Sequence, residues 1–341
     1  MTVIHAGSGA SGVGPGTTSP SRHAKPTSAD SDTNGDTNGD TNGGPGQTLD
    51  PKAAAVAADP GGAWRTEPTN RKEAFAQRHG IDVASVSTEH ELDVKLEKII
   101  DAADFLPSRW LTLGAVAMDA VGRIRTQTSL GTGFLVTPWL LMTNNHVLDS
   151  VAAADASTVT FRFENDRDDR MVRTIKLALE PHRCFVTSED LDVTLVAVAP
   201  TGDGNPPGAT FGHIPAKGAT GKILVGQPVN IIQHPDGRPR EVALRSNLLL
   251  TVDDATKLTY GTDTQPGSSG SPVLNDEWEL VALHHASSPP SNTLQSNVGI
   301  RVSAIVAKVT QLADNEAANP GTAGTEAAVM LQEFLEIGRM G

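Results

Sequence analysis

Short apolar runs that alternate with turn-forming residues restrict most strongly how this 341-residue chain can fold. Between about residues 106 and 302, runs rich in Val, Ile, Leu and Thr are separated by clusters of Gly, Pro, Asp and Asn. The runs are LGAVAMD, TGFLVT, TVTFRF, TIKLALE, DVTLVAV, PVNIIQH, EVALR, NLLLTV and ELVALHH. Many short strands with such punctuation predict an all-β fold. Roughly 200 residues of strands are too many for one small barrel and suit two.

The segments on either side of this β region differ from it in composition. The first 60 residues hold ten of the 33 glycines and no Phe, Trp or Tyr. Such a stretch buries too little apolar area to offset a backbone entropy of ~1–2 kcal/mol per residue, so we expect a disordered tail over 1–66. Charged residues with apolar ones at helical spacing predict a short helical lead-in over 67–105. The β domain, 106–313, is expected to close with a helix, and 314–341 to form a helical extension.

The composition excludes several classes of protein. The chain has 27 Lys and Arg against 40 Asp and Glu, a net charge of −13. This argues against nucleic acid as a partner, because phosphate binding needs a concentrated basic surface. The single cysteine, Cys184, rules out an internal disulfide or a cysteine-based zinc site, and we expect no cofactor. No run approaches the ~18 apolar residues of a membrane span. The start of the sequence lacks a secretory pattern, so we expect a cytoplasmic protein, with secretion left open.

Two candidate residues lie at the ends of expected strands. His146 follows the run WLLM, and Asp192 begins the run DVTLVAV. A lone histidine at a strand end is usually structural or exposed, and an aspartate there often caps a turn. An ionised carboxylate that is buried needs hydrogen-bonding partners, however, because its desolvation is costly. Neither residue identifies a site by itself.

The sequence PGSSGSP at 266–272 is the sharpest local signal. A flexible Gly/Ser linker is the alternative, but linkers do not lie between strands with a proline on each side. Pro266 and Pro272 fix the backbone, while Gly267 and Gly270 permit positive φ. A rigid turn of this kind exposes a serine hydroxyl and directs neighbouring N–H groups toward one point. Nucleophilic catalysis needs this arrangement.

Taken in order, GTGFLVT, TNNHV, LDVTLVAV and DTQPGSSGSPV closely resemble motifs of the trypsin-like serine peptidases. The resemblance is strongest to the bacterial branch that contains the glutamyl endopeptidases, and it covers about residues 106–312. It implies an all-β double barrel, with two six-stranded antiparallel β-barrels, a C-terminal helix and short flanking helices.

The resemblance also implies roles for individual residues. Ser269 would attack the scissile carbonyl, His146 would take its proton, and Asp192 would orient the imidazole. The backbone N–H groups of Gly267 and Ser269 would form the oxyanion hole. Ser271 is not the expected nucleophile, because the family places the reactive serine before the glycine of GSP.

Specificity depends on residues around this turn. Thr264 and His284 match positions that bind the substrate carboxylate in glutamyl endopeptidases, which favours Glu or Asp before the scissile bond. Asp263 matches the position where trypsin holds the aspartate that selects Arg or Lys, so a basic preference stays open. His285 is expected on the opposite face of its strand from His284, which makes this pair a poor metal site. The loop HPDGRP at 234–239 is interpreted as a turn without a catalytic role.

Two functions remain open from the sequence. The first is a serine endopeptidase that hydrolyses peptide or protein substrates. The second is a peptidase-fold binding or scaffold module with weak or gated activity. The helical segments at 70–105 and 326–340 offer places for a regulatory partner. Since a complete set of triad residues and an intact oxyanion turn are both present, the sequence favours the enzyme.

Overall fold

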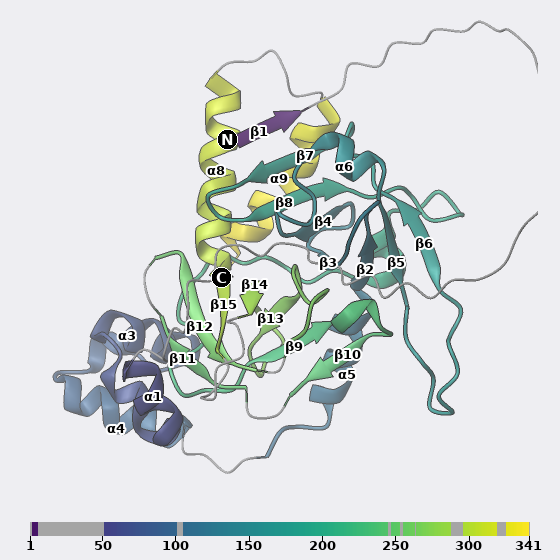
Figure 1. Cartoon of the computed structure of the whole chain (residues 1–341). Coiled ribbons are helices and arrows are strands. Elements are labelled where there is room, and N and C mark those ends of the chain that lie inside the picture. The colour runs from purple at the N-terminus through teal and green to yellow at the C-terminus, as the bar shows by residue number, and fades with distance from the viewer. Residues whose placement is uncertain are drawn as a thin grey trace, which may run out of the picture.

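Two antiparallel β-sheets with helices around them make up the molecule (Figure 1). This computed structural model describes residues 2–5, 51–100, 105–244, 247–252, 255–262, 264–287, 296–318 and 325–340. The prediction of a mainly β fold with two antiparallel units is confirmed at this level. Most of the expected disordered tail, residues 6–50, lies outside the described residues.

The first sheet has eight described strands in the order β1-β7-β8-β4-β3-β2-β5-β6. Their bounds are β1 Thr2–His5, β2 Val121–Arg125, β3 Leu130–Leu135, β4 Leu140–Thr143, β5 Thr158–Phe161, β6 Ile175–Ala178, β7 Phe185–Ser188 and β8 Val193–Ala197. Just past β6, the Glu180 N–H donates to the Ala197 carbonyl (2.8 Å), and the Ala199 N–H donates to that of Ala178 (3.0 Å). These bonds join β6 to β8, so six of the strands close into a ring.

The second sheet has seven described strands in the order β10-β9-β13-β14-β15-β12-β11. Their bounds are β9 Asn230–Gln233, β10 Glu241–Ala243, β11 Leu249–Thr251, β12 Lys257–Gly261, β13 Pro272–Leu274, β14 Leu280–Ser287 and β15 Ser296–Arg301. The Val229 N–H donates to the Asn247 carbonyl (2.7 Å), and the Gly226 N–H donates to that of Leu249 (2.8 Å). The chain before β9 thus meets β11, and six strands again form a ring. The sheets exceed the expected six strands because β1, β7 and β10 extend the rings at their edges.

Two C-terminal helices pack onto the largest buried apolar cluster, which spans both sheets. They are α8, Val302–Ala318, and α9, Thr325–Arg339. Met330 and Phe334 of α9 lie in that cluster, and the Gly338 carbonyl accepts a hydrogen bond from the Gly218 N–H (2.8 Å). The segment expected to be a separate extension therefore belongs to the core of the β domain.

The last residues of the predicted disordered tail form helices in the structure. These are α1, Pro51–Ala58, and α2, Pro60–Ala63, followed by the short 3-10 helix η1, Trp64–Thr66. Ala53 and Val56 pack against apolar residues of the second sheet, beside β11 (Figure 1). The prediction of a disordered tail is wrong over these residues. The alanine-rich run buries apolar side chains against the second sheet, and the sequence alone does not show that contact.

The predicted helical lead-in consists of α3, Thr69–Arg78, and α4, Glu89–Ile100, joined through the 3-10 helix η2, Val83–Ser85. Phe75 and Leu96 meet Leu224 of the β domain in a small apolar cluster. The buried Lys72 ammonium bonds the carboxylates of Glu89 (2.6 Å) and Asp93 (2.8 Å), which ties the two helices together.

The first run expected to be a strand, LGAVAMD, is instead part of α5, Arg109–Asp119. Its Leu, Ala and Met residues favour a helix, and tertiary packing decides the outcome. The ring of Trp278 lies so close to Gly114 that a Cβ there would come within 2.5 Å of it. The remaining helices are α6 Val151–Asp155, α7 Pro207–Phe211 and the 3-10 helix η3 Pro235–Gly237. None of the described helices is long and apolar enough to cross a membrane.

The buried face of α9 makes a direct prediction about stability. Phe334 is 0% exposed, whereas Val329 on the same helix is 64% exposed. We expect Phe334→Ala to lower the free energy of unfolding by ~3–5 kcal/mol, because it leaves a cavity in the core. Val329→Ala is the matched control and should change it by less than about 0.5 kcal/mol. Denaturant unfolding of the full chain measures both, and equal effects would show that α9 is not part of the core.

Candidate active site

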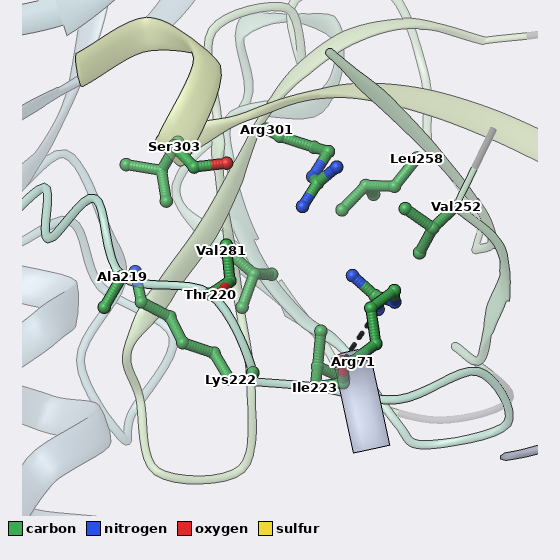
Figure 2. Close-up of a pocket in the computed structure, with 12 residues that line it drawn as sticks. Arg71, Ala219, Thr220, Lys222, Ile223, Val252, Leu258, Val281, Arg301 and Ser303 are labelled. Atoms are coloured by element: carbon green, nitrogen blue, oxygen red, sulfur yellow. Dashed lines mark hydrogen bonds between the residues drawn. The ribbon is translucent and has the colours of Figure 1, made fainter. Parts of the chain in front are cut away.

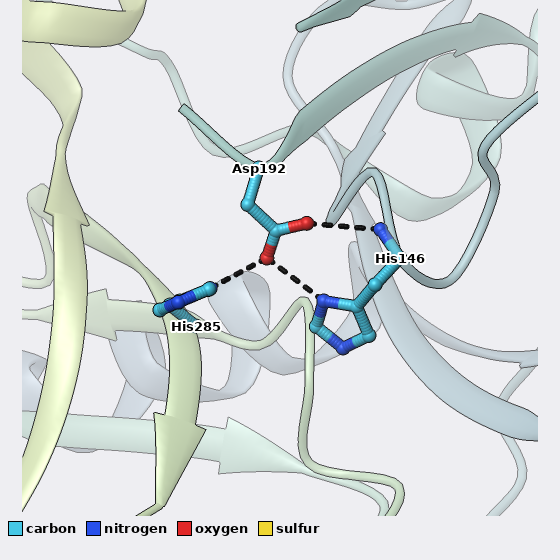
Figure 3. A group of neighbouring side chains, drawn as sticks. All are labelled: His146, Asp192 and His285. Carbon is cyan, nitrogen blue, oxygen red and sulfur yellow. Dashed lines mark hydrogen bonds and ion pairs between the residues drawn. The ribbon is translucent and has the colours of Figure 1, made fainter. Parts of the chain in front are cut away.

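His146 and Asp192 meet at the edge of the first sheet. His146 follows β4 and Asp192 precedes β8, and these two strands are neighbours. The Nδ1 atom of His146 lies 2.8 Å from Oδ2 of Asp192, and the backbone N–H of His146 donates to Oδ1 (2.9 Å) (Figure 3). A carboxylate that binds both the ring and the backbone of one histidine fixes the orientation of that ring. Two motifs that were weak in isolation are therefore brought together.

The structure holds the Asp192 carboxylate in its ionised form. Asp192 is only 9% exposed, and its backbone has a positive φ of 46°, which aspartate tolerates better than most residues. Asn144 supports this conformation, since its side-chain N–H donates to the Asp192 carbonyl (2.9 Å). Burial opposes ionisation, but hydrogen bonds from His146 and His285 outweigh it and lower the pKa of Asp192.

His285 is the member of this site that the sequence did not predict. Its Nδ1 atom lies 2.6 Å from the same Asp192 oxygen that His146 contacts (Figure 3). His284, its neighbour, points inward, where its Nδ1 meets the Tyr260 hydroxyl (2.6 Å). The expectation that the two histidines face opposite ways agrees with these contacts. No local pattern shows that β14 passes beside Asp192, because that proximity depends on how the two sheets pack.

The residues His146, Asp192 and His285 are also types that bind metal ions, and their ligand atoms lie within 4.8 Å of one another. Ligands at 2.0–2.2 Å from a tetrahedral zinc ion would lie roughly 3.3 Å apart. The observed N–O separations of 2.6 and 2.8 Å are shorter and are those of hydrogen bonds. We therefore interpret the group as a hydrogen-bond network.

Among the serines of the PGSSGSP turn, Ser269 is partly exposed, while Ser268 and Ser271 are buried. The N–H groups of Ser268, Gly270 and Ser271 donate to backbone carbonyls. Those of Gly267 and Ser269 donate to no residue in the described part of the chain. Two unpaired N–H donors beside a partly exposed hydroxyl are what an oxyanion hole requires. The roles assigned to Gly267 and Ser269 stay predictions.

Thr132 in β3 ties this turn to the first sheet. Its backbone N–H donates to the Ser269 carbonyl (2.9 Å), and its hydroxyl donates to the Gly267 carbonyl (2.8 Å). The same hydroxyl accepts a bond from the His234 N–H (3.1 Å). A Cβ added to Gly131 would touch Val147 and lie 3.6 Å from the Ser269 carbonyl oxygen. The Ser269 backbone thus lies against the segment that carries His146.

The loop interpreted as a simple turn, at 234–239, supports the serine turn from the other side. The Asp236 N–H donates to the Pro266 carbonyl (2.5 Å), and the Arg238 guanidinium donates to the side chain of Gln265 (2.9 Å). A Cβ at Gly267 would come within 2.8 Å of the His234 carbonyl oxygen. The loop therefore has a structural role in shaping the site.

The residues expected to set specificity differ in burial and in hydrogen bonding. The Thr264 hydroxyl donates to Oδ1 of Asn297 (2.7 Å), and Thr264 is half-buried. His284 is fully buried, and burial lowers the pKa of its imidazole to about 3, so the ring is neutral at neutral pH. Asp263 lies outside the described residues.

A small cavity lies elsewhere, between α3, the second sheet and the start of α8 (Figure 2). The guanidinium groups of Arg71 and Arg301 face it, and Arg71 donates to the Ile223 carbonyl (3.1 Å). The cavity shares no lining residue with the His146 network.

Comparison with known proteins agrees with this geometry. Residues 131–283 match the model of the trypsin-like peptidase domain, a range that contains His146, Asp192 and Ser269. The match supports a trypsin-like serine peptidase. It covers less than half of the chain and carries no information about residue preference.

Two curated relatives are similar to part of the chain. The uncharacterized protein y4fB of Sinorhizobium fredii is 40% identical over 208 residues, which cover 57% of this chain and 31% of y4fB. The secreted RxLR effector protein 73 of Plasmopara viticola is 29% identical over 200 residues, covering 53% of this chain and 48% of the effector. The chain therefore spans about a third to a half of the length of these relatives.

Two solved structures are also similar. Deg5 matches with a TM-score of 0.44 and 16% identity, covering 59% of this chain and 94% of Deg5. An inactive form of Rv3671c from M. tuberculosis H37Rv matches with a TM-score of 0.43 and 17% identity, covering 64% of this chain and 98% of that one.

The serine turn makes a second prediction about stability. Gly270 has a φ of 86°, and a Cβ there would lie 2.1 Å from the Thr132 carbonyl oxygen. We expect Gly270→Ala to cost at least about 2 kcal/mol of unfolding free energy, through backbone strain and overpacking. Gly202→Ala is the control, because nothing lies within 4 Å of its added Cβ. Thermal and denaturant unfolding test the pair, and an unaffected Gly270→Ala protein would show that the turn is looser than described.

Proposed function

We propose that the protein is a serine endopeptidase that uses Ser269 as nucleophile, His146 as general base and Asp192 as the residue that orients the base. One observation carries the proposal: Val147, the residue after His146, and the backbone carbonyl of Ser269 both lie against Gly131, and Ser269 is the partly exposed serine of the turn. The match of this region to the trypsin-like peptidase domain supports it.

The proposed reaction follows from the hydrogen-bonding roles of these groups. Because the Asp192 carboxylate only accepts hydrogen bonds, Nδ1 of His146 carries the proton, and the unprotonated Nε2 is the ring atom that acts as a proton acceptor. Nε2 takes the proton of the Ser269 hydroxyl as its oxygen bonds to the scissile carbonyl carbon, and the Gly267 and Ser269 N–H groups stabilise the oxyanion. The proton then passes to the leaving amine, and water hydrolyses the acyl-enzyme by the same steps in reverse order.

Covalent labelling tests this proposal. We expect a fluorophosphonate probe to label the folded full-length chain and to lose all labelling in Ser269→Ala. Ser271→Ala is the matched control and should keep labelling, since the Ser271 hydroxyl is buried and has no hydrogen-bond partner among the described residues. Asp192→Asn should slow labelling by roughly 10³–10⁴-fold, because the imidazole then takes the wrong tautomer.

Absence of labelling in the folded wild-type protein would instead favour the binding or scaffold module.

We further propose that the enzyme prefers Glu or Asp before the scissile bond. Thr264 lies two residues before the first residue of the serine turn, and the His284 carbonyl accepts the Gly270 N–H (3.1 Å). A neutral imidazole and a hydroxyl can both donate to a carboxylate, and the Thr264 hydroxyl would exchange its bond to Asn297 for one to an acidic side chain. This finer proposal depends on the resemblance to glutamyl endopeptidases.

Cleavage of matched peptides checks the preference. Peptides with Glu, Gln, Leu or Arg before the cut should be hydrolysed fastest when that residue is Glu. Thr264→Val keeps the shape of the side chain but removes its hydroxyl, and we expect it to lower the Glu-to-Gln ratio of kcat/KM by about tenfold, the effect of one charge-assisted hydrogen bond. Dominant cleavage after Arg would show that Asp263 governs the pocket.

A further inference from the structure

His285 connects the second sheet directly to the carboxylate of Asp192. Strand β14 pairs regularly with β15 up to His284, which lies opposite Gly299, and the next pair is Ala286 with Val298. His285 is therefore the extra residue of a β-bulge. A bulge leaves its extra residue unpaired and bends the strand locally, and bulges are common beside active sites. At this bulge the His285 imidazole meets Asp192.

The contact completes the hydrogen bonding of the carboxylate. Oδ1 of Asp192 accepts the His146 backbone N–H, and Oδ2 accepts both imidazole Nδ1–H groups. The two rings are 6.2 Å apart between centroids and inclined by 69°, so they approach the oxygen from different sides without stacking. His146 alone holds the carboxylate from one side, through its backbone N–H and its ring, and His285 adds a donor from the second sheet that restrains the carboxylate further.

We propose that His285 is a positioning residue of the peptidase reaction: it donates its Nδ1–H to Asp192 and thereby fixes the carboxylate that orients His146. The inference rests on the proposed function of the site. It assigns His285 no contact with the reacting atoms. The prediction that follows is a slower chemical step with unchanged substrate binding when the donor is removed.

Two substitutions of equal size separate the hydrogen bond from packing. Leu and Asn side chains have the same number of non-hydrogen atoms, but the Asn amide can donate from nearly the position of the imidazole Nδ1. We expect His285→Leu to lower kcat by about 10- to 100-fold with little change in KM, the effect of one hydrogen bond to a charged group. His285→Asn should recover most of this loss, and both variants should keep the wild-type melting temperature within a few degrees.

The contrary outcomes are equally specific. Equal activity of the Leu and Asn variants, whether both high or both low, would overturn the proposal, because the donor would then not matter. A change in KM alone would also overturn it and would instead make His285 a substrate contact.

A measurement that needs no activity separates this inference from the proposed function. In the Ser269→Ala protein, proton NMR should show two low-field imidazole N–H resonances, one from each histidine that donates to Asp192. His285→Leu in this background should remove one resonance and shift the other. If the resonances behave in this way but the wild-type protein does not label, the proposed function fails and the network stands. If His285→Leu leaves the spectrum unchanged, the network itself is refuted.

Discussion

The candidate site depends on a few hydrogen bonds that fix the position of one sheet relative to the other. Thr132 of the first sheet bonds the carbonyls of Gly267 and Ser269 in the turn of the second. His285 of the second sheet bonds Asp192 of the first. In the first contact a residue of the first sheet donates to the second, and in the other a residue of the second sheet donates to the first. Because His146 and Asp192 come from one sheet and Ser269 from the other, a small slip between the sheets would separate the three groups that the proposed reaction needs.

Helices outside the two sheets also hold the sheets together. Phe334 of α9 lies in the same apolar cluster as residues of both sheets, and α1 covers the second sheet near β11. With the single cysteine buried and its thiol pKa raised to about 12 by burial, the domain has no internal disulfide and depends on packing instead. Of the two segments that the sequence offers for regulation, 326–340 is thus part of the main apolar cluster, and 70–100 packs on the β domain through a smaller cluster.

The local sequence was sufficient to predict the serine turn, where glycines and prolines restrict the backbone next to a candidate nucleophile. Gly267 and Gly270 have positive φ because the turn needs it, and sequence reasoning identified that turn from its glycines and prolines. It also selected most strands of the two sheets. It failed for LGAVAMD, a helix in the structure, because a run of Leu, Ala and Met has no periodicity that excludes either state. The prediction of disorder failed for the alanine-rich α1, because helix propensity carries no information about the apolar residues of the second sheet against which α1 packs.

The sequence by itself determined the fold class, the serine turn, and the order of His146, Asp192 and Ser269, since these depend on local backbone rules and on motif order. Only the tertiary structure decided that His285 reaches the Asp192 carboxylate and that Thr132 holds the turn in place. Both contacts join residues far apart in the chain, and a one-residue bulge leaves His285 outside the regular pairing of β14 with β15. A sequence pattern with a period of two residues cannot encode such a shift, because it depends on the register between paired strands.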